Sequence, residues 1–256
     1  MLFDLHCHTL EGSPDANIPI VDVIELLREK GYNGMLVTDH NSYKGINSIN
    51  ITDVKDFTVL RGVEYDTKDG GHVIIVLPTG MDYEIFTLRG MFLEDVIKVV
   101  HALGGILGPA HPFDYYKLGL CNNPRWLSRI DLIKQLDFIE GFNACGREYG
   151  NILAEQLAVY LDKPCFGGSD SHRLDSVGLG CTKFNEEIKS EDDLIRVIKQ
   201  GNKLTTLVYG EIYENSVLNK HKIITNAGSK GCRFLTESVS FISKRKHRMI
   251  KEALGL

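Results

Sequence analysis

Short apolar runs alternate with segments of helical periodicity along most of the chain. Between Pro19 and Lys30, apolar residues recur at the spacing of one helix face, and Gly31 follows as a C-terminal cap. Apolar runs bounded by turn residues predict strands, which we expect over Leu2–His6, Gly34–Thr38, Phe57–Tyr65, Gly71–Leu77, Ile106–Ala110, Phe138–Phe142, Pro164–Gly168 and Leu179–Phe184. Helices are expected over Pro19–Lys30, Phe92–Leu103, Trp126–Gln135, Asn151–Leu161 and Ser190–Lys199, the last capped by Ser190 with Asp193.

The alternation of strands and helices predicts an α/β fold with a parallel sheet, closed into a barrel or open. The turn Thr67–Gly70 ends in Asp-Gly and indicates a hairpin between two of the strands. We expect one domain over residues 1–204. Residues 205–256 form a basic C-terminal extension, and Glu237–Leu254 in it has the pattern of an amphipathic helix.

Side chains that bind metals stand at the ends of the predicted strands. His6 and His8 are two residues apart in the first strand and therefore face the same side. Other candidate ligands follow later strands, and Asp15 lies in the loop after the first; they are Asp39, His40, Glu64, His72, His111, Asp170 and His172. The carboxyl ends of barrel strands build active sites. A set of His, Asp and Glu there predicts a centre of two or three divalent ions, Zn, Mn or Fe.

Some residues of the same types have other interpretations. His101 lies inside a predicted helix and is interpreted as structural, and Cys7 faces away from His6 and His8 toward the core. His221 and His247 belong to the basic extension. Asp39 either binds metal or orients the neighbouring His40.

The motifs together resemble the PHP (polymerase and histidinol phosphatase) family of metal-dependent phosphoesterases. The family order HxH, TDH, GxE, H, AHP and SDSH is matched over roughly residues 1–200 by His6-Cys7-His8, Thr38-Asp39-His40, Gly62-Val63-Glu64, His72, Ala110-His111-Pro112 and Ser169-Asp170-Ser171-His172. The stretch after Asp170 resembles the terminal motif of small free-standing members.

The resemblance implies a distorted (β/α)7 TIM-like barrel and up to three ions. By matched position, the first ion would be held by His6, His8, Glu64 and Asp170. Glu64 would bridge to a second, completed by His72 and His111, and the third would be held by Asp15, His40 and His172. Asp15 is the least regular match, because Gly12-Ser13-Pro14-Asp15 departs from the usual Ser-Asp-Gly form. Asn143 belongs to a segment that lines the pocket in relatives.

The activity we expect is hydrolysis of a phosphate ester by a metal-activated hydroxide. The leaving group would take its proton from His40, from Asp39 or from a water on the third ion. Arg147 and Arg173 follow predicted strand ends and either grip a phosphate in a bidentate way or lie on the surface.

The substrate class stays open. A phosphorylated small molecule or nucleotide comes first, and a 5′–3′ exonuclease or oligonucleotide phosphodiesterase is the alternative, favoured slightly by the basic extension. An amidohydrolase-type C–N hydrolase also begins with HxH on a barrel strand. A non-catalytic binding module of this fold would have lost some of its ligands, and here every expected position is filled.

The composition adds little to the predicted number of domains, charge distribution and state of the cysteines. The 256 residues suit one large domain or two small ones. The formal charge is −5; residues from Lys220 onward carry nine Lys or Arg against two acids, or +7, which leaves −5 − 7 = −12 for the rest. The six cysteines show no CxxC spacing, and neither a signal peptide nor a membrane-spanning run is evident, so we expect reduced thiols in a cytoplasmic protein. Oligomeric state cannot be inferred from the sequence.

Overall fold

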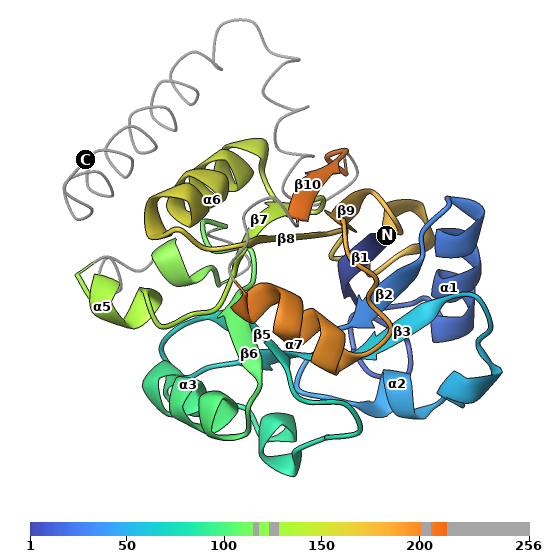
Figure 1. Ribbon diagram of the computed structural model, residues 1–256, viewed down its shortest axis with the longest axis horizontal. Helices are drawn as coiled ribbons and strands as arrows, with labels where there is room; N and C mark the ends of the chain where they lie inside the picture. The colour runs from blue at the N-terminus through green and yellow to red at the C-terminus, as the bar shows by residue number, and fades with distance from the viewer. Residues whose placement is uncertain (115–117, 123–127, 201–205, 214–256) are drawn as a thin grey trace, which may run out of the picture.

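A computed structural model describes residues 1–114, 118–122, 128–200 and 206–213 (Figure 1). The strands form three sheets. The largest has the order β10-β9-β1-β2-β3, from strands β1 Leu2–Cys7, β2 Gly34–Val37, β3 Thr58–Arg61, β9 Gly180–Phe184 and β10 Thr206–Gly210. The second has the order β4-β5-β6, from β4 Val63–Asp66, β5 His72–Val76 and β6 Ile106–Pro109. The third pairs β7 Ile139–Asn143 with β8 Cys165–Gly168.

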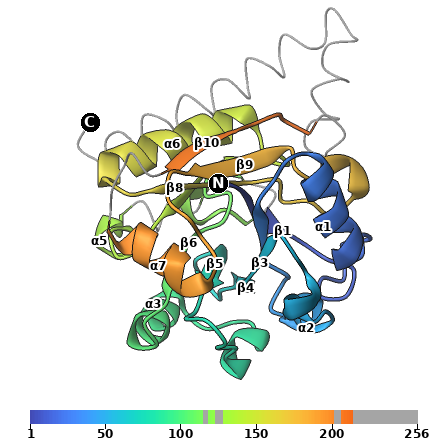
Figure 2. The same cartoon turned by 45° about the vertical axis from the view of Figure 1, so that its right-hand side comes forward.

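Most helices in this part of the chain match the predicted periodicity, but the short helix Lys44–Asn47 was not predicted. The helices are α1 Ile20–Glu29, α2 Lys44–Asn47, α3 Leu93–Ala102, α5 Ile130–Ile133, α6 Glu148–Leu161 and α7 Glu191–Lys199, with 3₁₀ turns η1 Ile51–Asp53, η2 Glu84–Thr87, η3 Leu120–Asn122 and η4 Leu174–Ser176. In both views α1 and α2 lie on the side of β1–β3, and α5 and α6 lie on the opposite side (Figures 1 and 2). None of the described helices has the length and apolar character needed to span a bilayer.

Sequence pattern predicted most of these elements to within a few residues, but the single strand predicted over Phe57–Tyr65 is wrong, because it is divided into β3 and β4, which belong to different sheets. The buried side chains of α1 are Ile20, Val23, Ile24 and Leu27, which are the residues whose spacing predicted the helix. The Ser190 cap of α7 is confirmed, because its Oγ accepts from the backbone N–H of Asp193 at 3.2 Å. The helix predicted over Trp126–Gln135 is a single turn, α5, in the described residues, and the one predicted over Glu237–Leu254 lies outside them.

The predicted α/β class is confirmed, but the pairing is more mixed than a parallel sheet. Pairs β1–β2, β2–β3 and β7–β8 are parallel, whereas β1–β9, β9–β10, β4–β5 and β5–β6 are antiparallel. Parallel neighbours need a crossover of about a dozen residues or more. The short turn between Asp66 and His72 therefore forces β4 and β5 into a hairpin.

Hydrogen-bonded ladders do not close into a barrel among the described strands, since they divide into three sheets. Even so, buried side chains from all three sheets meet in one apolar cluster with residues of α7; they include Phe3, Leu36, Leu60, Ile74, Ile106, Phe138, Phe166, Phe184 and Leu194. β10 lies in the predicted C-terminal extension, yet it pairs with β9 along its length. The extension therefore begins by adding a strand to the main sheet.

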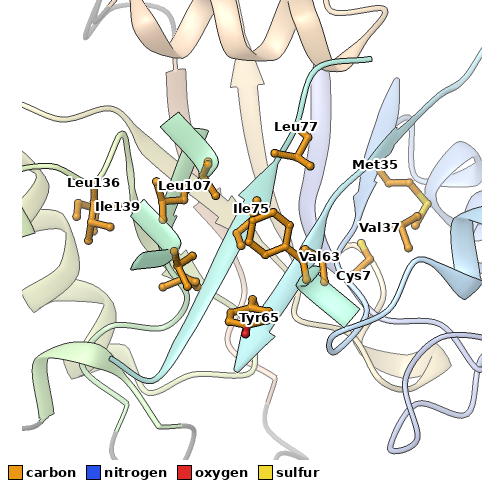
Figure 3. Close-up of a cluster of buried hydrophobic side chains, with 14 of the residues drawn as sticks. Cys7, Met35, Val37, Val63, Tyr65, Ile75, Leu77, Leu107, Leu136 and Ile139 are labelled. Atoms are coloured by element: carbon orange, nitrogen blue, oxygen red, sulfur yellow. The ribbon is translucent and has the colours of Figure 1, made fainter. Parts of the chain in front are cut away.

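A larger apolar cluster lies between the strands and the helices that cover them. Figure 3 shows its side chains spreading from Met35 and Val37 through Ile75 to Leu107 and Ile139. Cys7 is fully buried in this cluster, as its position in the first strand predicted. The five described cysteines form no disulfide with one another.

Candidate metal centre

β1 carries the first two candidate ligands into the interior. His6 lies in β1 and His8 follows its end, and both side chains are buried. Their Nε2 atoms are 3.1 Å apart, so the two rings converge as the shared strand face predicted.

Glu64 lies between two sets of imidazoles. This β4 residue is fully buried. Its Oε2 is 3.3 Å from Nε2 of His6 and 3.2 Å from Nε2 of His8. Its Oε1 is 3.2 Å from Nδ1 of His72 and 2.9 Å from Nε2 of His111. The two carboxylate oxygens thus face different sets of rings, so Glu64 could serve two ligand groups at once.

Asp170 completes the set of ligands around His6 and His8. It follows β8 in a left-handed backbone conformation, with φ of 53°. Its Oδ1 lies 3.2 Å from Nε2 of His8 and 3.5 Å from Nε2 of His6. The backbone N–H of Asp170 donates to the carbonyl of His6 at 2.7 Å, so the end of β8 is tied to β1.

A third set of ligands lies toward the surface. The ring of His8 stacks on that of His172 at 4.1 Å and lies 4.6 Å from that of His40. Asp15 places Oδ2 3.4 Å from Nε2 of His172 and 3.6 Å from Nε2 of His40. His40 also contacts Glu64 Oε2 through Nδ1 at 3.3 Å, which joins this set to the other two.

The structure therefore brings all nine predicted ligands together. Ligand atoms within 4.8 Å of one another form four groups, namely His6/His8/Glu64/Asp170, Glu64/His72/His111, His8/His40/His172 and His40/Asp66/His72. The first two match the sets that the family resemblance implied for two ions. The third contains two of the three residues implied for another ion, and Asp15 borders it.

Divalent cations fit these groups chemically. Glu64 Oε2, His40 Nδ1 and His72 Nδ1 are buried and have no hydrogen-bond partner within the described parts of the chain. A buried lone pair without a donor is costly, and a cation would satisfy it. Imidazole nitrogen and carboxylate oxygen are the ligands that Zn, Mn and Fe accept.

Burial and the neighbouring charges oppose each other in the centre. Burial disfavours charge on His6, but Glu140, Asp170 and Glu64 outweigh it and raise the pKa of His6 well above its usual range. Burial likewise disfavours charge on Glu64, yet the imidazoles hold the pKa of that carboxylate well below its usual range. His40 differs, because burial together with neighbouring His8 and His72 lowers its pKa to about 4.

Stabilisation by metal is expected to increase between pH 6.5 and 9. Hydrogen bonds to Asp170 and Glu64 overcome burial and raise the pKa of His8 from 6.5 to about 9. Protonated His8 therefore stabilises the metal-free fold below pH 6.5, and that contribution is lost as the pH rises through 9. A metal needs the neutral ring, so the same proton opposes binding at low pH. Melting temperatures in EDTA and in Mn²⁺ across this range check the expectation. A metal-induced shift that is the same at every pH contradicts it.

Glu140 is a site residue that the sequence did not single out. It is buried in β7, and its Oε1 lies 2.7 Å from Nδ1 of His6. Its Oε2 accepts the backbone N–H of His111, and both oxygens accept from Nδ2 of Asn143 at 3.2 Å. One carboxylate therefore positions ligands of two different metal sets. The available signal was an acid inside the apolar run Phe138–Phe142.

Asp66 is the second residue that sequence reasoning missed. It lies two positions after Glu64 in β4 and therefore on the same face, the same relation that His6 has to His8. Its Oδ1 lies 3.2 Å from Nε2 of His72 and 3.8 Å from Nδ1 of His40. With Nδ1 of His72 facing Glu64, the Asp66 carboxylate fixes the orientation of the His72 ring.

Asp39 bonds to the loop that follows β1, and no hydrogen bond or ion pair among the described residues joins it to the His40 ring. Its Oδ1 accepts from the backbone N–H of Thr9 at 2.7 Å and from Oγ of Ser13 at 3.0 Å. Ser13 Oγ in turn lies 3.0 Å from Nδ1 of His8. Burial raises the pKa of Asp39. These contacts make Asp39 an anchor of the first loop, and through Ser13 it orients His8.

The predicted substrate-binding residues lie in different surroundings. Asn143 is buried and donates to Asp170 Oδ2 at 3.1 Å as well as to Glu140, so it supports the ligands. Arg147 is half-buried and lines a small pocket together with His111. Arg173 is exposed directly after His172. His101 lies apart from the ligand groups and pairs with Asp137 at 3.0 Å, as its structural interpretation predicted.

Comparisons with known proteins agree with the resemblance. Residues 148–202 match the family model described as PHP-associated. PsfC from Pseudomonas syringae PB-5123 has a similar structure, with a TM-score of 0.60 at 16% identity, over 88% of this chain and 96% of PsfC. No curated protein matches the chain.

Two further structures share the fold over part of their length. One is a two-domain protein from Bacteroides vulgatus ATCC 8482 that contains a predicted PHP-like metal-dependent phosphoesterase. Its TM-score is 0.56 at 14% identity, and the match covers 82% of this chain and 65% of that protein. The other is Endonuclease Q in complex with a 27-mer duplex substrate that has an abasic lesion at the active site. Its TM-score is 0.60 at 16% identity, and the match covers 78% of this chain and 57% of Endonuclease Q. The chain thus spans less than two thirds of these two proteins. The family model and the shared fold both bear out the resemblance predicted from sequence.

Proposed function

We propose that this chain is a PHP-type metal-dependent phosphoesterase that hydrolyses a phosphorylated small molecule or nucleotide. The observation that carries the proposal is the divided carboxylate of Glu64, which has His6 and His8 at one oxygen and His72 and His111 at the other. An acid at the junction of two histidine sets suits a polynuclear centre better than a single structural ion.

The proposed ligands are those that the resemblance implied, and all of them except Asp15 belong to one of the ligand groups. His6, His8, Glu64 and Asp170 would hold one ion; Glu64, His72 and His111 a second; and Asp15, His40 and His172 a third. Zn, Mn or Fe, when bound there, would provide a nucleophile from water at neutral pH and offset the charge of the phosphate. Two or three ions and a distorted barrel around them stay part of the proposal.

We favour a water over His40 or Asp39 as the source of the proton for the leaving oxygen. His40 has a pKa lowered to about 4 by burial, so its neutral ring suits a ligand better than a proton donor at pH 7. Asp39 is engaged by Thr9 and Ser13. A water held in the site is the remaining candidate of the three. Arg147, beside His111, is proposed to contact the phosphate, and Arg173 is the weaker candidate because it is exposed.

Substrate class is tested by a panel with the full chain and added Mn²⁺ or Zn²⁺. We expect hydrolysis of 4-nitrophenyl phosphate and of small phosphomonoesters, with kcat/KM for these at least about tenfold above that for bis(4-nitrophenyl) phosphate and for short RNA, because differential binding at the transition state sets such ratios. The reverse order contradicts the monoesterase proposal and supports the phosphodiesterase.

A nuclease is the second candidate function. It is favoured by the shared fold with Endonuclease Q, whose structure holds a DNA duplex. Cleavage of a 5′-labelled or 3′-labelled oligonucleotide distinguishes a 5′–3′ exonuclease from an endonuclease. The amidohydrolase and the non-catalytic module are less favoured, because the ligand set is complete and includes the early carboxylate Glu64. A cytoplasmic location stays a prediction.

A further inference from the structure

The ligand cluster has a buried side and an accessible side. Side chains of His6, His8, Glu64 and His111 are at most 4% exposed. His40 and His172 are 18% and 25% exposed. Among the described residues, the side of His40, His72 and His172 is therefore the more exposed side of the centre, and a substrate can approach from there.

A pocket of about 620 Å³ begins at His40 on that side. Its walls come from the segment around α2, including Tyr43, Lys44 and Asn47, and from the segment that leads into η2, including Asp82 and Glu84. Its volume is in the range of small-molecule sites. The pocket therefore adjoins the proposed metal centre and is large enough for the organic part of a small phosphate ester.

The charges in the pocket are mixed. Asp82 is offset by Arg61, whose Nη1 lies 3.7 Å from Asp82 Oδ2 and donates to Asn47 Oδ1 at 2.6 Å. Lys44 is exposed and has no ion pair within the described ranges, and Glu84 also lines the pocket. One ammonium group and one carboxylate that face the same space suit hydroxyl groups, which accept from the first and donate to the second. Tyr43 offers little apolar surface, because it is only 6% exposed.

We propose that this pocket binds the alcohol part of the substrate and selects polyhydroxylated phosphomonoesters, such as sugar phosphates. This inference rests on the proposed phosphoesterase function and adds the substrate class. Lys44 and Glu84 are the specificity-determining residues. A polynucleotide is disfavoured, because strands of nucleic acid need a row of cations and stacking aromatic rings, whereas this pocket has one lysine among its lining and carboxylates beside it.

The test compares ribose 5-phosphate with 4-nitrophenyl phosphate in the metal-loaded full chain. Lys44→Ala and Glu84→Gln are each expected to raise KM for ribose 5-phosphate about tenfold, the usual loss for one charged hydrogen bond, with kcat changed less than about threefold. KM for 4-nitrophenyl phosphate should stay the same, since its ring offers no hydroxyl group. Lys98→Ala is the matched control, because this exposed lysine pairs with Glu94 and does not line the pocket.

The outcomes separate this inference from the function it rests on. If both variants retain the wild-type KM for ribose 5-phosphate, the pocket does not bind the alcohol part of the substrate, but the proposed phosphoesterase function is not contradicted. If KM rises equally for both substrates, the selectivity for hydroxyl groups is wrong. If the metal-loaded wild type hydrolyses neither ester, this result contradicts both the proposed function and this inference.

Discussion

Replacing Glu64 with alanine is expected to lower kcat/KM for 4-nitrophenyl phosphate by at least about 1,000-fold, or about 4 kcal/mol of transition-state stabilisation. The residue is fully buried, and its two oxygens face five imidazoles, those of His6, His8, His40, His72 and His111. Without it, both sets lose their shared ligand and the rings lose the charge that balances them. Metal analysis of the purified variant should find fewer ions per chain than in the wild type.

Glu191→Gln is the matched control for this result. Glu191 is also a buried glutamate, but its Oε1 accepts the backbone N–H of Arg61 at 2.7 Å and it belongs to none of the ligand groups. This variant should keep its metal and its activity. Glu64→Gln retains the volume of the side chain and separates loss of charge from loss of folding. Wild-type metal content and activity in both Glu64 variants would refute a bridging carboxylate.

Replacing Glu140 is expected to lower metal affinity or activity about 10- to 100-fold, the usual cost of removing a partner that orients a metal ligand. Glu140→Gln keeps the shape but removes the charge beside Nδ1 of His6. Glu140→Ala should also destabilise the fold by about 3 kcal/mol, because the backbone N–H of His111 and the amide of Asn143 lose a buried acceptor. Isothermal titration with Mn²⁺ and chemical denaturation measure the two effects.

The conservative variant distinguishes a positioning role from a structural one. If Glu140 acts through His6, Glu140→Gln should weaken metal binding while its unfolding free energy stays close to that of the wild type. Equal metal affinity in Glu140→Gln and the wild type would contradict the role, even if Glu140→Ala were unstable. Glu191→Gln again reports the effect of neutralising a buried glutamate elsewhere.

Much of the centre could be predicted because its ligands stand at strand ends. The side-chain alternation of a strand put His6 and His8 on one face, and the structure places their Nε2 atoms 3.1 Å apart. Asp39 shows the limit of the same reasoning. Its neighbour in sequence is His40, but its carboxylate bonds to Thr9 and Ser13 across the loop.

Other features depend on contacts between residues distant in sequence. In the sequence, Glu140 is one acid in an apolar strand. The packing of β7 beside β6, and of its partner β8 beside β1, brings Glu140 to His6 and to the backbone of His111. The antiparallel pairing of β5 with β6 was equally hidden, because the long connection between them permits either direction. β10 lies in the extension that was predicted to begin at residue 205, whereas its partner β9 precedes it across α7.

The central claim is that phosphate ester hydrolysis depends on divalent ions held by this cluster. The most direct measurement is hydrolysis of 4-nitrophenyl phosphate by one preparation of the full chain, assayed as purified, after removal of metal by a chelator, and after stepwise return of Mn²⁺ or Zn²⁺ with metal content followed in parallel. The account predicts that activity is lost with the metal and returns only as at least two ions per chain are bound. Full activity in the metal-free protein, or none at any metal content, would contradict it.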